Sequence, residues 1–137
     1  MARTTKFREQ HADLLQLATE LVKIGPEQLS RDAAPARSLL SKFLGRLTLH
    51  LAVEDRSLYP DLQMSDDPDV VSMAKRFATE MGGLAATVLA WGKRWPTPAT
   101  IQAQPQRFIT ETAQIVDALK GRIHREHQEL YPALDAM

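Results

Sequence analysis

The amino-acid sequence predicts an all-α protein, an antiparallel up-down-up-down four-helix bundle. Two observations support this fold class. Glycine and proline punctuate the 137 residues at only a few places and divide them into four long segments. Within each segment apolar residues recur at steps of three and four, which is the helical period, and the sequence has no alternating strand pattern of useful length. We expect a single domain over residues 1–137, with short links between antiparallel neighbours.

The first two helices are delimited by glycine and proline. The first is expected over about residues 4–24, because Gly25-Pro26 is a helix-ending pair. The second is expected to begin near Pro35 and to continue to about Met64. Their inward positions are Phe7, His11, Leu14, Ala18 and Leu21 in the first helix, and Leu40, Phe43, Leu47, His50, Glu54 and Leu58 in the second.

The third helix has a strong start signal in Asp-Pro-Asp at residues 67–69, and it is expected to end before Pro96. Gly82-Gly83 lies in its middle, where each glycine costs about 1 kcal/mol relative to alanine. A close helix approach, a ligand channel, a helix irregularity and simple drift all stay open as explanations. Residues 98–105 are expected to form a crossover or a short helical turn, followed by the fourth helix. Its inward line is Phe108, Ile115, Leu119, Arg122, Glu126 and Leu130.

Composition excludes several classes of function. The 17 lysine and arginine residues balance 17 aspartate and glutamate residues, so the net charge is zero and nucleic acid is not an expected partner. The absence of cysteine excludes disulfides and thiolate metal sites and fits a reducing cytoplasm. No apolar stretch is long enough for a signal peptide or a bilayer span. We therefore expect a cytoplasmic protein without a membrane partner; a homodimer, with Trp91 and Trp95 as its patch, stays open.

Ionisable residues stand on the buried stripes of three helices. Burying a charge is costly unless it is paired or coordinates a metal. His50 and Glu54 are four residues apart and share one helix face, and His11 and Glu126 stand on two other inward stripes. Imidazole and carboxylate are ligands for iron, manganese or zinc, and bundle cores hold such sites. Hydrogen-bonded core histidines would give the same spacing, so spacing alone leaves both interpretations open.

The stretch HLAVEDRSLYP at residues 50–60 resembles the signature of the hemerythrin-like (HHE) cation-binding domains: histidine, glutamate four later, then Leu-Tyr/Phe-Pro. REHQELYP at residues 125–132 repeats the ending, and REQHADLL at residues 8–15 is similar to the family's first-helix histidine. The resemblance covers nearly the whole chain. It implies a non-haem di-iron centre with roles in oxygen binding, sensing or storage. It implies His11 and His50 as terminal ligands of one iron, and Glu54 and Glu126 as carboxylates that could bridge to a second.

The sequence departs from the family pattern at two ligand positions. Aligning the two Leu-Tyr-Pro endings places Arg122 opposite His50, where the family usually has histidine. The Glu-His pair of the family's third helix reads Glu80-Met81 here. Neither arginine nor methionine suits hard iron. We therefore expect one iron rather than two, with Glu80 as a further candidate ligand; manganese, zinc and the absence of any metal stay open.

Arg122 is expected to supply the positive charge that a second iron would have supplied. Arginine offers a permanent cation and a fork that fits a carboxylate, so we hypothesise a pair with Glu80 or with a bridging carboxylate. The alternative is a side chain that extends to solvent at the bundle end. His124 and His127 flank Glu126, but the helical phase turns them about 160° and about 100° away from it. We expect both to be exposed or at an interface unless a local bulge changes the phase.

Three functions follow in order of preference. The first is a hemerythrin-like non-haem metal protein with an incomplete di-iron site that senses or scavenges dioxygen, nitric oxide or another redox ligand. The second is a metal-free four-helix interaction module in which Arg122 replaces the second metal. An enzyme ranks last, because the sequence shows no nucleophile and no nucleotide loop. Tyr59 and Tyr131 are assigned to packing at the helix ends.

Overall fold

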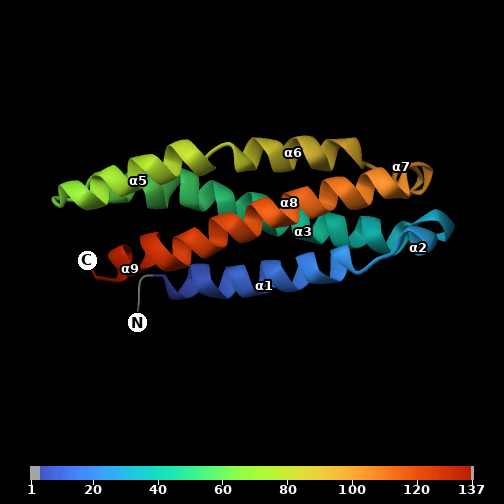
Figure 1. Cartoon of the computed structure of the whole chain (residues 1–137), viewed down its shortest axis with the longest axis horizontal. Helices are drawn as coiled ribbons and strands as arrows, with labels where there is room; N and C mark the ends of the chain where they lie inside the picture. Colours follow the sequence, from blue (N-terminus) through green and yellow to red (C-terminus); the bar gives the residue numbers. More distant parts are fainter. Residues whose placement is uncertain (1–3, 137) are drawn as a thin grey trace.

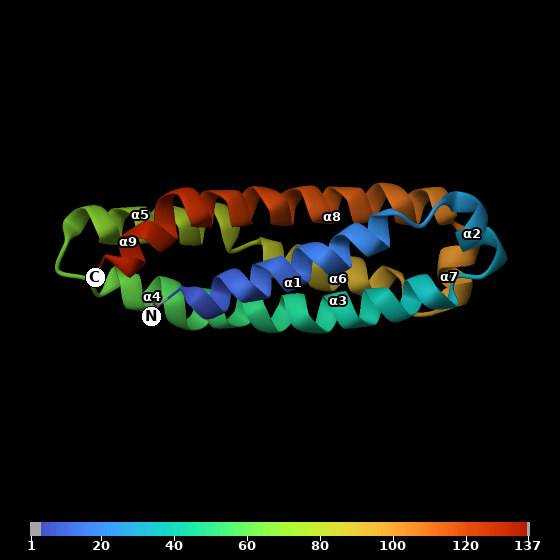
Figure 2. The ribbon, with the colours of Figure 1, turned by 90° about the horizontal axis from the view of Figure 1, so that it is seen from below.

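The computed structural model describes residues 4–136, and over that range all regular secondary structure is helical, without strands. This confirms the predicted all-α class. Four long helical segments run side by side along the molecule, and both described termini lie at the same end (Figures 1 and 2). The segments are α1 (Thr5–Val22); α3 (Ala34–Val53) with η1 (Glu54–Leu58) and α4 (Tyr59–Gln63); α5 (Pro68–Met81) with α6 (Leu84–Arg94); and α8 (Pro105–Arg125) with η2 (Glu126–Leu130) and α9 (Tyr131–Asp135).

Two short helices close the end of the molecule opposite the termini (Figure 1). One is α2 (Pro26–Arg31), and the other is α7 (Pro98–Ala103). Gly25-Pro26 was predicted only to end the first helix, but proline is also favoured at the first helical position, and Pro26 starts α2. The predicted start at Asp67 is confirmed, since its carboxylate accepts a hydrogen bond of 2.9 Å from the backbone N–H of Asp69.

Glycine divides the third long segment, which was predicted as one continuous helix. α5 ends at Met81, and α6 begins at Leu84 after a turn at Gly82-Gly83. A Cβ atom on Gly82 would lie 2.5 Å from the carbonyl oxygen of Ala78, so the turn brings its own backbone closer than a side chain tolerates. Of the explanations that the sequence left open, the helix irregularity is the one present at Gly82-Gly83.

Two π-helical turns interrupt the second and fourth segments at the repeated Leu-Tyr-Pro endings. Pro60 and Pro132 have no N–H to donate, and in an α-helix their rings would collide with the carbonyl four residues earlier. The backbone widens instead. The N–H of Tyr59 bonds the carbonyl five residues back at Glu54, and Tyr131 does the same to Glu126. Each π turn therefore begins at one of the two candidate ligand glutamates.

The core consists of two apolar clusters with a layer of buried polar side chains between them along the helices. The larger cluster contains both tryptophans, with Trp91 fully buried and Trp95 2% exposed, so within this chain they fill the core. The smaller cluster lies under α4, α5 and α9. Five buried polar residues lie in the stretches of chain where residues of the larger cluster give way to residues of the smaller one: His11, His50, Glu54, Arg122 and Glu126. None of the helices within residues 4–136 combines the length and apolar character needed to cross a bilayer.

Candidate metal centre

Four buried side chains from three of the long segments converge in the polar layer. They are His11 from α1, His50 from α3, Glu54 from the start of η1 and Glu126 from the start of η2. Each offers a ligand atom, and these atoms all lie within 4.8 Å of one another. The least buried of the four, His50, is only 3% exposed. The structure thus brings together four of the five ligands that the sequence analysis named.

The distances from His11 to the other three residues fit a single small cation, and Nε2 of His50 is in closer contact with Oε1 of Glu54. Nε2 of His11 lies 3.0 Å from Nε2 of His50, 3.3 Å from Oε1 of Glu126 and 3.7 Å from Oε1 of Glu54. Neighbouring ligands of one ion lie about 3 Å apart when each bond is about 2.1 Å. Oε1 of Glu54 and Oε1 of Glu126 are buried and accept no hydrogen bond from the described part of the chain. Buried oxygens without a donor are unfavourable, and a cation among them would satisfy both.

Two outer residues orient the histidine rings. Nδ1 of His50 lies 2.6 Å from Oε1 of Gln10, an atom that can only accept, so Nδ1 carries the proton and Nε2 presents its lone pair to the cluster. Nδ1 of His11 lies 2.8 Å from Nε2 of His127. Burial, and then the positive charges of His11 and Arg8, lower the pKa of His127. A neutral His127 therefore accepts from His11, whose Nε2 also faces the cluster.

The two tyrosines of the repeated endings cross over to each other's glutamate. The hydroxyl of Tyr59 donates to Oε2 of Glu126 at 2.6 Å, and that of Tyr131 donates to Oε2 of Glu54 at 3.2 Å. Burial, followed by the charges of the two carboxylates, raises the pKa of both phenols above their usual range. Both tyrosines are therefore neutral donors at neutral pH, and they belong to the site as well as to the helix-end packing that the sequence predicted.

The pKa values of the two buried carboxyl groups, Glu54 and Glu126, are shifted in opposite directions. Burial raises the pKa of Glu126, and the contact with Glu54 raises it further, to about 7. Burial also disfavours the charged form of Glu54, but contacts with Glu126, His11 and His50 outweigh it and lower the pKa of Glu54. The pair therefore holds one proton near neutral pH, and a metal cation would compete with that proton.

Arg122 lies in the polar layer beside this cluster and is 3% exposed. Its Nε donates to Oε2 of Glu126 at 3.3 Å, its Nη2 to Oδ1 of Asp55 at 2.8 Å, and its Nη1 to the carbonyl oxygen of Met81 at 3.1 Å. The guanidinium carbon also stands 5.3 Å from the centre of the Tyr59 ring. The side chain does not extend to solvent; it pairs with a site carboxylate, one of the two partners that we hypothesised.

Glu80 lies outside the cluster, which corrects its assignment as a fifth ligand. Its side chain is 43% exposed and forms an ion pair with Arg125. The reason is helical phase: Met81 faces the core, so the preceding residue turns about 100° away from it. The Arg122–Glu80 pair is likewise absent from the contacts of Arg122 within residues 4–136.

The two histidines that flank Glu126 lie in different surroundings. His124 is exposed, as predicted. His127 is partly buried and touches His11, so the prediction of an exposed ring needs correction. The π turn η2 begins at Glu126 and supplies the bulge that alters the phase of an ideal helix. Sequence reasoning also missed Gln10 and Asp55, although each directly adjoins a predicted ligand.

The comparisons with known proteins agree with this geometry. No curated protein and no solved structure matched the chain. A family model, the hemerythrin HHE cation-binding domain, matches residues 3–134, which is nearly the whole chain. The match includes both repeated endings and all four converging side chains. The chain therefore belongs to the hemerythrin HHE cation-binding domain family.

Proposed function

We propose that this protein binds one iron ion through His11, His50, Glu54 and Glu126 and uses it to sense or scavenge dioxygen or nitric oxide. The observation that carries the proposal is the convergence of two imidazole Nε2 atoms with two buried carboxylate oxygens that accept no hydrogen bond from the described part of the chain. Imidazole with carboxylate suits iron, and manganese or zinc would accept the same donors. The packing of α1 against α3 and α8, and of α6 against the same two helices, supports the antiparallel up-down-up-down topology of such a centre.

The surroundings of Glu126 favour one ion over two. A carboxylate that bridges two metals with one oxygen on each needs both of its oxygens free. Here Oε2 of Glu126 already accepts from Tyr59 and Arg122, and Oε2 of Glu54 accepts from Tyr131. The buried guanidinium would also repel a second cation at this short range. Arg122 therefore takes the charge-balancing role of the second metal.

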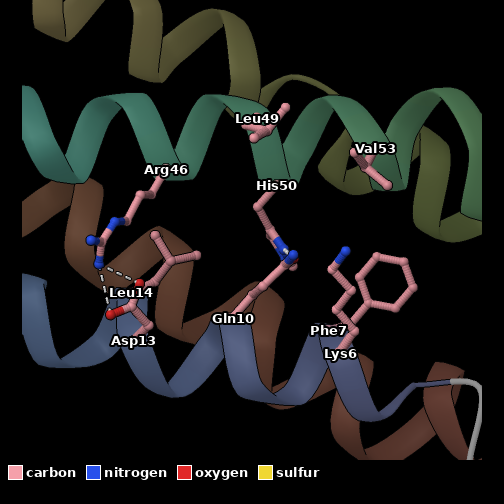
Figure 3. Close-up of a pocket in the computed structure, with 9 residues that line it drawn as sticks. All are labelled: Lys6, Phe7, Gln10, Asp13, Leu14, Arg46, Leu49, His50 and Val53. Carbon is pink, nitrogen blue, oxygen red and sulfur yellow. Dashed lines mark hydrogen bonds and ion pairs between the residues drawn. The ribbon is translucent and has the colours of Figure 1, made fainter.

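A pocket of about 390 Å³ between α1 and α3 reaches the outer edge of the site. Figure 3 shows Gln10 and His50 meeting across it from the two helices, while Asp13 and Arg46 pair at one side. Its apolar wall consists of Phe7, Leu14, Leu49 and Val53. An apolar route suits small, uncharged diatomic molecules. An iron ion held in the cluster would supply an open coordination position for such a ligand.

Metal analysis tests the proposal directly. Protein purified without chelators and then loaded anaerobically with ferrous iron should hold about one equivalent, measured by elemental analysis. His50→Ala should lose the ion, because it removes a buried donor from the cluster. Glu80→Ala is the matched control, since Glu80 lies in an exposed ion pair, and it should keep the ion. Iron below about a tenth of an equivalent in the loaded wild type would refute the proposal.

A metal-free interaction module is the second candidate, and the contacts of Arg122 favour it. Three acceptors satisfy its buried guanidinium without any metal, which a stable salt-bridged network requires. This candidate predicts that chelators leave the melting temperature unchanged. A metal-binding protein is instead stabilised by about 2.7 kcal/mol when the free metal exceeds its Kd a hundredfold. A scanning calorimetry run with and without chelator separates the two.

A further inference from the structure

The hydroxyl groups of the two buried tyrosines are held differently. Tyr59 makes one short hydrogen bond, 2.6 Å long, to Oε2 of Glu126. The Tyr131 oxygen lies 3.2 Å from Oε2 of Glu54 and equally 3.2 Å from Nε2 of His11. Both of its neighbours belong to proposed ligands of the ion. The Tyr131 oxygen therefore stands at the edge of the ligand cluster, while the Tyr59 oxygen stands behind one carboxylate.

The spacing of the Tyr131 oxygen is that of a ligand. Nε2 of His11 has its proposed fellow ligands at 3.0 and 3.3 Å, in His50 and Glu126, and it has the Tyr131 oxygen at 3.2 Å. Neighbouring donors around one first-row metal are about 3 Å apart. The phenol adds a further donor oxygen to the two nitrogens and two carboxylates.

The Tyr131 ring is fixed in this position by its neighbours. It is fully buried and stacks on the His11 ring, with centroids 5.5 Å apart and planes 14° apart. Phe7 stacks beside it at 6.0 Å, and the guanidinium carbon of Arg8 lies 5.2 Å from the ring centre. A donor held by packing is already in place when the ion arrives, so its binding costs little ordering.

We propose that Tyr131 is a fifth ligand that binds ferric iron as a phenolate. This inference rests on the proposed iron site. When the ion binds, the phenol O–H bond breaks, an oxygen–iron bond forms, and the proton passes to solvent; the oxidation state of the iron does not change. An anionic oxygen donor favours the ferric over the ferrous state. Tyr131 would thereby bias the site toward its oxidised form, which suits a sensor of oxidants.

Visible absorption of the ferric-loaded full chain tests the assignment, because a phenolate bound to ferric iron gives a charge-transfer band in the visible range. The wild type should show this band at about one equivalent of iron. Tyr131→Phe should lose the band while it keeps iron. The control variant, Tyr59→Phe, removes a hydrogen bond to the proposed ligand Glu126, so it should bind iron more weakly, but once loaded it should keep the band, since the Tyr59 oxygen lies behind Glu126. Zinc-loaded wild type should be colourless.

The chain has only two tyrosines, so the control variant alone can assign the band. A band that persists in Tyr59→Phe must arise from Tyr131, even if Tyr131→Phe fails to fold. Stoichiometric ferric iron without a visible band in the wild type would overturn the proposal and leave the iron site intact. A band that disappears in Tyr59→Phe and persists in Tyr131→Phe would also overturn it. A wild type that binds no iron would overturn the proposed function as well.

Discussion

The candidate metal centre has two halves, which share the same backbone feature, a π-helical turn, but carry different side chains. In each half a glutamate opens a π-helical turn that leads into Leu-Tyr-Pro. Four residues before the glutamate, one half has His50 and the other has Arg122. The half around Glu54 thus offers a neutral metal donor, and the half around Glu126 offers a permanent cation.

This difference indicates that the backbone positions the two carboxylates. The side chain four residues earlier then determines whether a metal or an arginine balances their negative charge. In the first half, His50 contacts Oε1 of Glu54, an oxygen that accepts no hydrogen bond within residues 4–136. In the second half, Arg122 donates to Glu126 and also to Asp55. A carboxylate beside an arginine has its charge already compensated, and it needs no second metal.

The largest expected effect comes from making the second half resemble the first. In the Met81→His/Arg122→His variant, two neutral imidazoles replace the cation and the methionine, so the iron content should rise from about one to about two equivalents. A second ion bound with micromolar Kd corresponds to about 8 kcal/mol of binding free energy. Elemental analysis and isothermal titration calorimetry measure this change. Each single variant serves as a control, and a folded double variant that still binds one ion would refute the comparison.

Removing the cation without adding a donor should destabilise the metal-free protein. Arg122→Gln leaves Asp55 and Glu126 without their buried partner, which typically costs about 3–5 kcal/mol. Urea denaturation of chelator-treated protein gives the free energy of unfolding. Arg46→Gln is the control, because Arg46 pairs with Asp13 on the surface, where such pairs contribute about 1 kcal/mol or less. Similar losses in the two variants would mean that Arg122 is not a buried counterion.

Gln10 and His127 hydrogen-bond the two ligand histidines and orient their rings. The loss of these bonds should therefore weaken metal binding more than it lowers the free energy of unfolding. Gln10→Ala and His127→Ala each remove the partner of a ligand histidine, at His50 and His11 respectively. Loss of such a partner typically weakens metal affinity by about 10- to 100-fold. Competition with a chelator of known affinity measures it. His124→Ala, at an exposed position, should leave the affinity unchanged, and an equal loss in that variant would argue against orientation by Gln10 and His127.

Helical periodicity was sufficient to predict the all-helical class and to place the four converging residues on inward faces. Counting residues at the helical period works for these residues because α1 and α3 are regular up to the site. Past Glu126 it still places Leu130 correctly on the buried face, but it misplaces His127, whose contact with His11 departs from the ideal phase where Pro132 widens the helix. A proline in a sequence marks such a place, but it does not reveal whether the backbone kinks, ends or widens.

The partner of Arg122 could not be chosen from the sequence. Glu80 and Glu126 both lie near the right level, and their order along the chain does not show which way each faces. The choice depends on where α5 ends. Helical phase turns Met81 toward the core, and because α5 ends at Met81 its carbonyl oxygen, in the last turn, is free to accept from Arg122. A glycine pair signals the break without showing which carbonyl it frees.

The smallest expected effect tests this last link, between the Gly82-Gly83 turn and Arg122. Both glycines have right-handed helical backbone angles, so alanine is allowed by conformation at either one. A Cβ on Gly83 meets open space, and Gly83→Ala should raise the free energy of unfolding by about 0.4–1 kcal/mol by restricting the unfolded chain.

A Cβ on Gly82 meets the Ala78 carbonyl, and Gly82→Ala should lower the free energy of unfolding by about 1 kcal/mol. We expect the backbone shift that relieves this contact to displace the adjacent Met81 carbonyl and weaken its hydrogen bond with Arg122. The loss in Gly82→Ala should therefore shrink when Arg122→Gln is already present, and urea denaturation of the four proteins in that double-mutant cycle measures the coupling. Additive effects would show that the helix break and the buried cation are independent features of this half.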